Sequence, residues 1–441
     1  MRKIYYPLLA LGLAALASVS SRADNGIPGY IPSDEIVEAQ KEFSDNKFGI
    51  FLHWGIYSMT AQGEWYMNNV GIDWREYEKL ASGFYPSKFD AAAWVSAIKA
   101  SGAKYICLTS RHHDGFSMFG TEYSDFNIVD ATPFGRDILK ELAEECRRQG
   151  IKLHLYYSHI DWRRSDYPKG RTGLNTGCDR SQENWTQYFT FMNNQLTELL
   201  TNYGPIGAIW FDGKWDHDMD PDFDWQLDEQ YAMIHRLQPS CLIANNHHET
   251  PFPGENIQIF ERDLPGENKA GLSGQSVSDH LPLETCETMN GMWGYKITDQ
   301  NYKSTKDLIH LLVRAAGKNA NLLLNIGPQP NGELPQTAVL RLKEIGEWMQ
   351  KYGETIYGTR IGEIAPHPWG VSTSKDNVQY IHILDYQDNV IFLPVRSKVK
   401  SAVCFNTGEP LKFTKNANGI VVNLSKVPDE VDYIVRLTVE E

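Results

Sequence analysis

Short apolar runs alternate along most of the chain with longer segments whose apolar residues recur at helical spacing. Eight of these runs predict β-strands: Phe48–His53, Tyr105–Ser110, Leu153–Ser158, Ile206–Asp212, Cys241–Asn245, Ile257–Glu261, Leu283–Thr288 and Asn321–Ile326. The clearest predicted helices are Asp90–Ala100, Asp137–Gln149, Trp185–Tyr203 and Thr305–Lys318. Strand–helix alternation favours parallel pairing, and eight strands are typical of a (β/α)₈ barrel. The connections after the sixth and seventh strands are predicted to be too short or irregular for full helices.

The pattern changes after a predicted helix at Gln336–Lys351. Short runs with alternating apolar residues follow it: Val378–Leu384, Asn389–Leu393, Ala402–Cys404, Gly419–Leu424 and Tyr433–Val439. Such runs, separated by turn-forming residues, predict an antiparallel β-sandwich. We therefore expect a (β/α)₈-like catalytic domain at 24–351 and a C-terminal β-sandwich domain at 352–441.

The N-terminus has the pattern of a secretory signal peptide. Basic residues at Arg2 and Lys3 precede an apolar run, and small residues follow it up to Ala23. Residues 1–23 are therefore predicted to be removed, and the mature protein is predicted to be periplasmic or secreted. No later segment reaches the ~18 continuous apolar residues that a membrane span needs, so no membrane attachment is expected.

Composition narrows the classes of partner. The net charge is −14 and no basic stripe is present, which argues against nucleic acid, whose phosphates require clustered Lys and Arg. The six cysteines lie far apart, without the spacing of a disulfide framework or a metal site, and are predicted to be mostly buried free thiols. The 12 Trp and 22 Tyr could stack on sugar rings or could fill a large core.

Polar residues stand at the ends of the predicted barrel strands. His53 ends the first run, the segment Arg111-His112-His113-Asp114-Gly115 follows the second, Tyr156 lies near the end of the third, and Asp212 and Glu261 end the fourth and sixth. Active sites of such barrels lie at the carboxyl ends of the strands. We expect these side chains to converge on one face.

Asp212 gives the sharpest signal, because the run Ile206-Gly207-Ala208-Ile209-Trp210-Phe211 before it is strongly apolar. A carboxylate at the barrel mouth can attack an anomeric carbon; the alternative is an Asp that caps the following turn. A second carboxyl is then needed as acid catalyst, and the candidates are Glu249, Glu255, Glu261, Glu284 and Glu287. Glu261 is favoured because it follows a strand; its alternative is a surface ion pair with Arg262.

Other polar residues near the strand ends could bind sugar hydroxyls. His112 and His113 can both donate and accept hydrogen bonds, although core packing is an alternative. If both belong to a strand they point to opposite faces, which argues against a shared metal ion. Glu64 and Trp65, after the first strand, offer a carboxylate beside an aromatic plane, or they anchor a loop.

Several of these segments, in the same order, resemble the family 29 α-L-fucosidases over roughly residues 40 to 345. The matching segments are Phe48-Gly49-Ile50-Phe51-Leu52-His53-Trp54-Gly55, Glu64-Trp65-Tyr66, His112-His113-Asp114-Gly115-Phe116, Arg136-Asp137, Tyr156-Tyr157-Ser158, Trp210-Phe211-Asp212-Gly213, Glu284-Thr285-Cys286, Trp293-Gly294-Tyr295 and Leu323-Leu324-Asn325-Ile326-Gly327-Pro328. Each piece alone is weak, but the combination is specific.

The resemblance implies a retaining double displacement, with no metal or organic cofactor, on a fucosylated oligosaccharide or glycoconjugate. By position, Asp212 matches the nucleophile. The residues that match contacts around the fucose are His53, Glu64, His112, His113 and Tyr156 for its hydroxyls, and Trp210 and Trp293 for its aromatic walls, with Trp293 near the methyl group. No short motif fixes the acid/base, so Glu261 rests on the strand argument. Many members have an Arg in the preceding loop, where this chain reads Asn245-Asn246-His247-His248.

The segment Asp125–Phe134 resembles the branch of the family that requires α-1,3- or α-1,4-linked fucose. Three alternatives stay open from the sequence. The first is a fucosidase of relaxed specificity, the second is another exported (β/α)₈ glycosidase, and the third is a carbohydrate-binding protein without catalysis.

Overall fold

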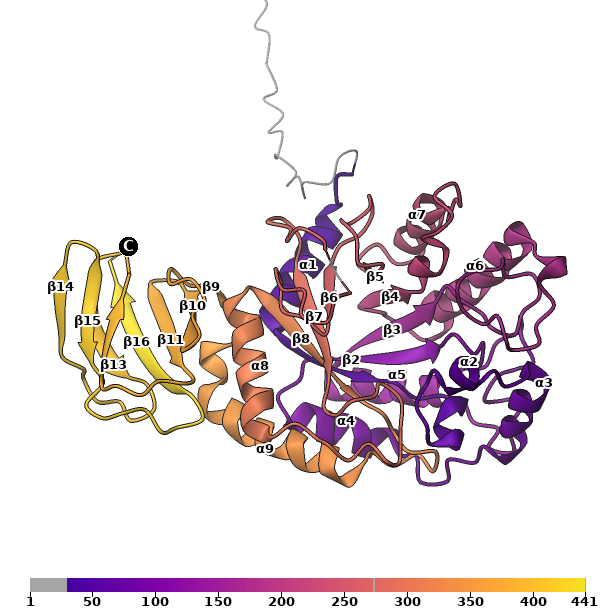
Figure 1. Cartoon of the computed structure of the whole chain (residues 1–441), viewed down its shortest axis with the longest axis horizontal. Helices are drawn as coiled ribbons and strands as arrows, with labels where there is room; N and C mark the ends of the chain where they lie inside the picture. Colours follow the sequence, from indigo (N-terminus) through magenta and orange to yellow (C-terminus); the bar gives the residue numbers. More distant parts are fainter. Residues whose placement is uncertain (1–29, 273, 441) are drawn as a thin grey trace, which may run out of the picture.

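The computed structural model describes residues 30–272 and 274–440, which form two parts lying side by side (Figure 1). A parallel barrel with its helices forms the larger part, and antiparallel sheets form the C-terminal part. The predicted signal peptide, residues 1–23, lies outside the described residues. Within the described residues, no helix has the length and apolar character needed to cross a bilayer.

Eight parallel strands form the barrel, in the spatial order β5-β4-β3-β2-β1-β8-β7-β6. Their bounds are β1 Phe48–Leu52, β2 Tyr105–Arg111, β3 Lys152–Ser158, β4 Ala208–Asp212, β5 Leu242–Asn246, β6 Gln258–Glu261, β7 Leu283–Thr288 and β8 Ala320–Ile326. Every predicted barrel strand is present, so the predicted barrel is confirmed.

The barrel closes through a weak seam between β5 and β6. A single parallel bridge, between Ala244 and Ile257, joins these two strands. Two backbone N–H groups, of Asn256 and Ile257, also donate to the carbonyl oxygen of Ile243 at 2.8 and 3.2 Å. The other neighbouring strands in the barrel share ladders of at least four residue pairs, so this seam has the fewest interstrand hydrogen bonds.

Helices surround the barrel where the sequence places a capping residue before an amphipathic segment. The main helices are α1 Asp34–Asn46, α4 Ala91–Ala100, α5 Ile138–Gln149, α6 Trp185–Asn202, α7 Leu227–Leu237, α8 Thr305–Gly317 and α9 Gln336–Tyr352. Asp90 and Asp137 accept hydrogen bonds from the first turns of α4 and α5, and Ser304 forms a capping box with Asp307 on α8.

The remaining helical elements among the described residues are two short helices, α2 Tyr66–Val70 and α3 Trp74–Tyr77, and five 3₁₀ turns: η1 Ile56–Thr60, η2 Glu78–Gly83, η3 Arg180–Gln182, η4 Lys214–His217 and η5 Gly353–Thr355. The connections that lack an α-helix follow β5 and β6, whereas the connection after β7 carries α8. The prediction for the seventh connection was therefore wrong. Its first half is irregular, but its second half is α8, which matches the helix predicted at Thr305–Lys318.

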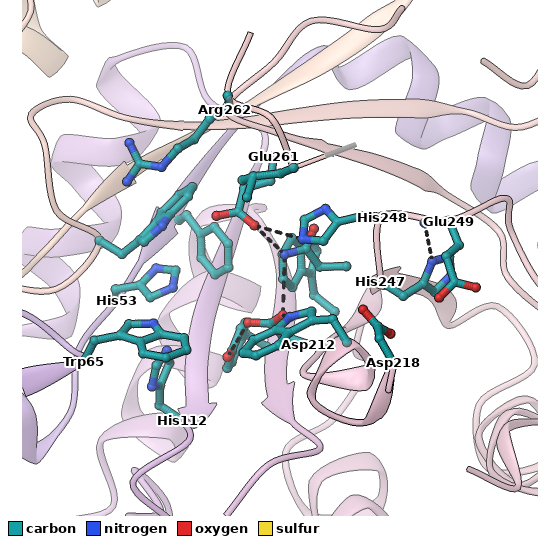
Figure 2. A pocket seen from close by; sticks show the side chains of 18 of the residues that line it. His53, Trp65, His112, Asp212, Asp218, His247, His248, Glu249, Glu261 and Arg262 are labelled. Carbon is teal, nitrogen blue, oxygen red and sulfur yellow. Dashed lines mark hydrogen bonds and ion pairs between the residues drawn. The ribbon is translucent and has the colours of Figure 1, made fainter. Parts of the chain in front are cut away.

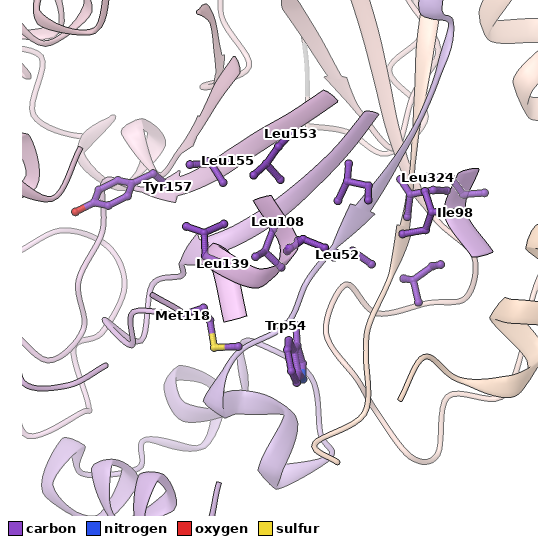
Figure 3. Close-up of a cluster of buried hydrophobic side chains, with 14 of the residues drawn as sticks. Leu52, Trp54, Ile98, Leu108, Met118, Leu139, Leu153, Leu155, Tyr157 and Leu324 are labelled. Carbon is purple, nitrogen blue, oxygen red and sulfur yellow. The ribbon is translucent and has the colours of Figure 1, made fainter. Parts of the chain in front are cut away.

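Alternate side chains of each barrel strand point to opposite sides. Phe51, Cys107 and Leu323 fill the interior, while Leu52 and Leu108 point outward against the helices. Figure 3 shows this outer layer, in which the leucines of the strands meet side chains of α4 and α5. In each strand, every second residue packs against the helices, and the residues between them fill the interior of the barrel.

The C-terminal part has two antiparallel sheets, in the orders β13-β16-β11-β10-β9 and β12-β15-β14. Their strands are β9 Arg360–Ile361, β10 Gly370–Lys375, β11 Val378–Ile383, β12 Val390–Leu393, β13 Val399–Cys404, β14 Phe413–Asn416, β15 Gly419–Asn423 and β16 Tyr433–Val439. The predicted sandwich is confirmed, but the sequence pattern missed β9, β10 and β14. The proposed division between 24–351 and 352–441 falls at the last residue of α9.

The two parts share a packed boundary. Val371 of β10 belongs to the same apolar cluster as the barrel helices, and a methyl group added at Gly317 of α8 would lie 2.5 Å from its side chain. All six cysteines are free and five of them are buried, which confirms the predicted, mostly buried free thiols.

Candidate active site

A cavity of about 770 Å³ opens at the carboxyl ends of the barrel strands. Its lining includes eight residues singled out below: His53, Trp65, His112, Asp212, Asn246, His248, Glu261 and Trp293. Figure 2 labels six of them, all except Asn246 and Trp293. These side chains lie together because they continue the rows of strand residues that point into the barrel. In β4, Ala208 and Trp210 point into the barrel, so Asp212, two residues further, emerges at its mouth.

Asp212 is the polar centre of the cavity, and three neutral groups donate to its carboxylate. The hydroxyl of Tyr156 donates to Oδ2 at 3.0 Å, the indole N–H of Trp215 to Oδ1 at 2.9 Å, and the amide of Asn246 to Oδ1 at 3.4 Å. Asp212 is the last residue of β4 and Trp215 lies in η4, the turn after it. The carboxylate is therefore held from three different elements.

The second carboxyl at the cavity, Glu261, is joined to Asp212 by one side chain. Asn246 Nδ2 donates to Glu261 Oε2 at 2.8 Å and to Asp212 Oδ1 at 3.4 Å, so these two oxygens are at most about 6 Å apart, the sum of the two contacts. Retaining glycosidases separate their carboxyls by about 5–5.5 Å, and inverting enzymes by about 6.5–9.5 Å. The geometry thus favours a retaining arrangement.

Burial, followed by the nearby charge of Glu261, raises the pKa of Asp212 from its ordinary value of 3.8 to about 7. The hydrogen bonds from Trp215, Tyr156 and Asn246 oppose this shift. His113 Nε2 lies 3.5 Å from Oδ2, but burial lowers the pKa of His113 to about 3. The imidazole is therefore neutral, and it does not balance the charge of the carboxylate.

A buried chain of contacts fixes His113 from behind. Its Nδ1 lies 2.6 Å from the hydroxyl of Ser158, and Arg111 donates to the carbonyl oxygen of Ser158 at 3.1 Å. Arg111 is itself fully buried and forms an ion pair with buried Asp161. The attraction of Asp161 offsets part of the cost of burying this guanidinium, whose Nε has no hydrogen-bond partner among the described residues. The pair ties the end of β2 to the segment that follows β3.

The wall next to Asp212 consists of neutral histidines. His53 Nδ1 lies 2.7 Å from Asn325 Oδ1, and burial lowers the pKa of His53 to about 3. Burial also lowers the pKa of His112. Because the rings are neutral, each can donate one hydrogen bond and accept another. Among the described residues, Nδ1 of His112 is a buried atom without a hydrogen-bond partner, and the residue itself lines the cavity.

The structure corrects the expectation for His112 and His113. The strand β2 ends at Arg111, so both histidines lie in the following loop, and their ring centroids are 4.2 Å apart. They do not point to opposite faces as strand residues would. His112 lines the cavity and stacks on Tyr156, whereas His113 reaches Asp212. Within the described residues, no group of three or more His, Cys, Asp or Glu side chains is arranged to hold a metal ion.

Aromatic rings form the remaining walls. Trp65 stacks on Trp215, with ring centroids 5.8 Å apart, and Trp293 lies 5.2 Å from the ring of His53. Trp210 lines the floor, where its indole N–H donates to Glu284 at 3.0 Å.

Glu64 is buried and accepts the backbone N–H of Gly294 at 2.7 Å. Its carboxylate is therefore in position to hold the segment that carries Trp293. Burial raises the pKa of Glu64, which is expected for a carboxyl group with little access to solvent.

The other candidate acids are engaged elsewhere. Glu284 is buried below the floor, where Tyr105 and Trp210 donate to it. Glu255 is buried against His247 at 3.0 Å, and Glu287 lies beside Arg262 and Lys303. Glu249 reaches the cavity but pairs with Lys214 at 2.8 Å. Glu261 is thus the carboxyl that shares a hydrogen-bond donor, the side-chain amide of Asn246, with Asp212.

Sequence reasoning missed three residues of this site: Asn246, Trp215 and His248. Asn246 pairs in register with Asp212 at the end of the neighbouring strand, and extending the fifth predicted strand by one residue would have found it. His248 Nε2 lies 3.6 Å from Glu261, on a backbone with a φ of 64°. Trp215 lies in the 3₁₀ turn after β4 and contacts Asp212 from there, so a search for polar residues at strand ends does not find it.

Two segments could determine which fucose linkage is accepted, and only one of them lines the cavity. In the segment Asp125–Phe134, Phe126 and Ile128 are buried in the core, and no residue of that segment lines the cavity. The loop after Glu261 does line it, through Ala270, Gly271 and Leu272. Asp263 holds this loop by accepting the backbone N–H groups of Lys269 and Ala270 at 2.9 and 3.0 Å.

Comparisons with known proteins agree on one family. A model of the alpha-L-fucosidase family matches residues 19–354. An alpha-L-fucosidase of Dictyostelium discoideum is 29% identical over 446 residues, which cover 90% of this chain and 92% of the relative. The plasma alpha-L-fucosidase of Homo sapiens is 29% identical over 430 residues, which cover 87% and 85%.

Solved structures are similar over nearly the whole chain. Alpha-L-fucosidase isoenzyme 1 from Paenibacillus thiaminolyticus superposes with a TM-score of 0.82 at 33% identity, covering 92% of this chain and 100% of its own. A GH29 alpha-L-fucosidase from Bacteroides thetaiotaomicron, solved as a trapped covalent intermediate with 2-fluoro-fucosyl fluoride, superposes with a TM-score of 0.79 at 26% identity, covering 92% and 96%.

Replacing Asp212 by Asn should stabilise the protein above pH 7. The pKa of Asp212 is about 7 in the folded protein, against an ordinary value of 3.8, so the stability from its bound proton is present at low pH and is lost as the pH rises through 7. The amide removes this loss, and we expect a gain of about 1–3 kcal/mol near pH 8. Near pH 4 the two proteins should be similar.

Thermal unfolding of both proteins across this pH range measures the difference. Asp125→Asn is the matched control, because the Asp125 side chain is 92% exposed, and its unfolding temperature should follow that of the wild type. An Asp212→Asn protein that unfolds below the wild type near pH 8 would show that the carboxylate does not destabilise the fold.

Proposed function

The chain belongs to the alpha-L-fucosidase family of glycoside hydrolases, and from that premise we propose that it is a retaining enzyme in which Asp212 is the nucleophile and Glu261 the acid/base. The observation that carries this assignment is the shared amide of Asn246, which holds the two carboxyls within about 6 Å. We call Asp212 and Glu261 the catalytic pair.

In the first step Asp212 attacks the anomeric carbon of fucose. An ester bond forms between this carbon and the carboxylate, while the bond to the leaving oxygen breaks and that oxygen takes the proton of Glu261. Tyr156, Trp215 and Asn246 hold the attacking carboxylate in one orientation. They restrain its rotation, so that less ordering is needed in the transition state.

In the second step Glu261 is a carboxylate and acts as a base. It removes a proton from a water molecule, whose oxygen attacks the anomeric carbon and displaces Asp212 with a second inversion. The two inversions give net retention. A related fucosidase was solved as a trapped covalent intermediate, which supports this route for the present chain.

The walls of the cavity fit a small deoxysugar. The neutral His53 and His112 can donate to and accept from adjacent hydroxyls, and Nδ1 of His112 has no partner among the described residues. Trp65 and Trp293 offer apolar faces to the ring and to the methyl group. We therefore place the fucose between these histidines and the catalytic pair.

We further propose that the enzyme prefers α-1,3- and α-1,4-linked fucose on a branched glycan. The support is the loop that follows Glu261, because Ala270, Gly271 and Leu272 line the cavity and Asp263 holds the loop in place. A loop on the side of the acid can contact a galactose attached next to the fucose.

The chain is also proposed to be exported, on the basis of residues 1–23. Expression of the full chain in a bacterial host should deliver a periplasmic protein whose N-terminal sequence begins close to residue 24. A cytoplasmic protein that retains residue 1 would contradict the export proposal.

The two carboxyls should give separable kinetic defects. Asp212→Gly should reduce kcat by roughly 10⁴-fold or more on every fucoside, because no covalent intermediate can form, and azide should restore part of the activity. Glu261→Ala should reduce kcat/KM on natural linkages by about 10²–10⁴-fold. It should harm an aryl fucoside with a good leaving group far less in the first step, since that group needs no proton.

Glu284→Gln is the matched control for Glu261→Ala. Glu284 is buried below the floor of the cavity, so its loss should affect both kinds of substrate equally. Full activity of Asp212→Gly would refute the assignment of Asp212 as the nucleophile. If Glu284→Gln shows the selective defect and Glu261→Ala does not, the acid has been assigned to the wrong residue.

Rates on four substrates test the linkage proposal. A Lewis trisaccharide should be cleaved at least about tenfold faster, in kcat/KM, than its disaccharide without galactose, 2′-fucosyllactose or an aryl fucoside. Binding energy from the galactose is used in the transition state, so its removal should lower kcat as well as raise KM. Similar rates on all four would refute the preference for branched glycans and leave the fucosidase assignment intact.

A further inference from the structure

A second cavity, of about 590 Å³, lies beside the catalytic cavity. We call it the extension cleft and define it by six of its lining residues: Lys214, His217, Asp218, Phe223, Trp225 and Glu249. Asp218 and Glu249 line both cavities. The two hollows are therefore neighbours that share a wall, and a ligand long enough to cross this wall can occupy both.

The extension cleft lies on the side where the leaving group must depart. In Figure 2, His53 and His112 lie on one side of the catalytic pair, and Asp218 and Glu249 lie on the other. Since the fucose is placed against the histidines and the acid must contact the leaving oxygen, the rest of the glycan extends past Glu261 toward Asp218 and Glu249. From there the shared wall leads into the extension cleft.

Aromatic rings form one side of the extension cleft. Phe223 stacks on His217 with ring centroids 4.2 Å apart and an interplanar angle of 13°, and Trp225 meets the edge of Phe223 at 5.0 Å. Phe223 is partly exposed, whereas His217 and Trp225 are buried. A partly exposed ring supported from behind by two others is a rigid apolar plane, which suits the face of a sugar ring.

His217 supplies a polar group that the protein does not use. The residue is 7% exposed, and among the described residues its Nε2 has no hydrogen-bond partner. Burial lowers the pKa of His217, so the ring is neutral and Nε2 can pair with a hydroxyl as donor or acceptor. An unpaired buried nitrogen costs stability unless a ligand or water satisfies it, and His217 is one of the residues that line the cleft.

The charges of the extension cleft favour one class of ligand. Asp218, Asp220, Asp224, Asp228 and Glu249 line it, with Lys214 as the one Lys or Arg side chain among its lining residues. Lys214 pairs with Glu249 at 2.8 Å. Carboxylates accept hydrogen bonds from sugar hydroxyls, but they repel sulfate, phosphate and sialic acid groups.

We propose that the extension cleft is a binding site for a neutral saccharide that extends the leaving group beyond the sugar attached to fucose. Phe223 supplies the stacking plane, and His217 supplies a hydrogen bond to a hydroxyl. This inference rests on the proposed function, because it assumes that Glu261 protonates the leaving oxygen. It adds a site that makes the rate depend on glycan length.

Two fucosylated substrates of different length test the proposal. One is a Lewis trisaccharide, and the other is the neutral pentasaccharide that carries the same trisaccharide on a lactose unit. In the wild type, kcat/KM should be about 3- to 10-fold higher for the pentasaccharide, the range that one aromatic contact supplies. Phe223→Ala should bring the ratio to about one while the rate on the trisaccharide stays unchanged.

His217→Phe distinguishes the contribution of the ring nitrogen from that of the aromatic ring. It keeps an aromatic ring against Phe223 and removes Nε2, so the ratio should fall about twofold and should not disappear. Phe392→Ala is the matched control, because Phe392 is 45% exposed on β12 in the sandwich, and it should keep the full ratio. Equal rates on both substrates in the wild type would overturn the proposal, as would an unchanged ratio in Phe223→Ala.

Binding of the fucose-free tetrasaccharide gives a readout that needs no turnover. Calorimetry should detect its binding to the wild type and a loss of affinity of about 3- to 10-fold in Phe223→Ala, with no change in Phe392→Ala. Absence of binding to the wild type would overturn the proposed site. Failure of the fucosidase assignment has a different signature, which is no turnover of either fucosylated substrate.

Discussion

The active site depends on keeping the largely buried carboxylate of Asp212 beside a second carboxyl. Removing a charge from water is costly, and no Lys or Arg forms an ion pair with Asp212 among the described residues. Neutral donors compensate instead, from the end of β3, the turn after β4 and the end of β5. Three separate elements must therefore be in register before the site can exist.

Other polar groups around the same cavity are also buried. His53, His112 and His113 are all held neutral by burial, and Nδ1 of His112 has no partner among the described residues. Such unsatisfied groups cost stability in an empty protein and become useful when a polyhydroxylated ligand arrives. The fold tolerates them because the strands below are packed on both faces, with Leu52 and Leu108 outside and Phe51 inside.

The sequence predicted the parts of the structure that local pattern controls. Apolar runs located all eight barrel strands, and their polar ends located Asp212 and Glu261 in one cavity. β10 was missed because Ser372 and Thr373 are polar, yet both are buried and bonded to distant groups. Trp215 and Asn246 were missed for a related reason: their importance comes from a contact with Asp212, and spacing along the chain does not encode that contact.

The seam between β5 and β6 separates the strand that carries Asp212, together with its neighbour β5, from the strand that carries Glu261. Asn246 ends one strand and Glu261 ends the other, and a single bridge joins them. The interval between the proposed nucleophile, Asp212, and the proposed acid, Glu261, is thus set where the barrel has the fewest interstrand bonds. Stereochemical outcome depends on that interval, so a change in the connection 247–257 can shift the acid while the nucleophile keeps its strand. The distance on which retention or inversion depends is therefore spanned by the most weakly joined strand pair of this barrel.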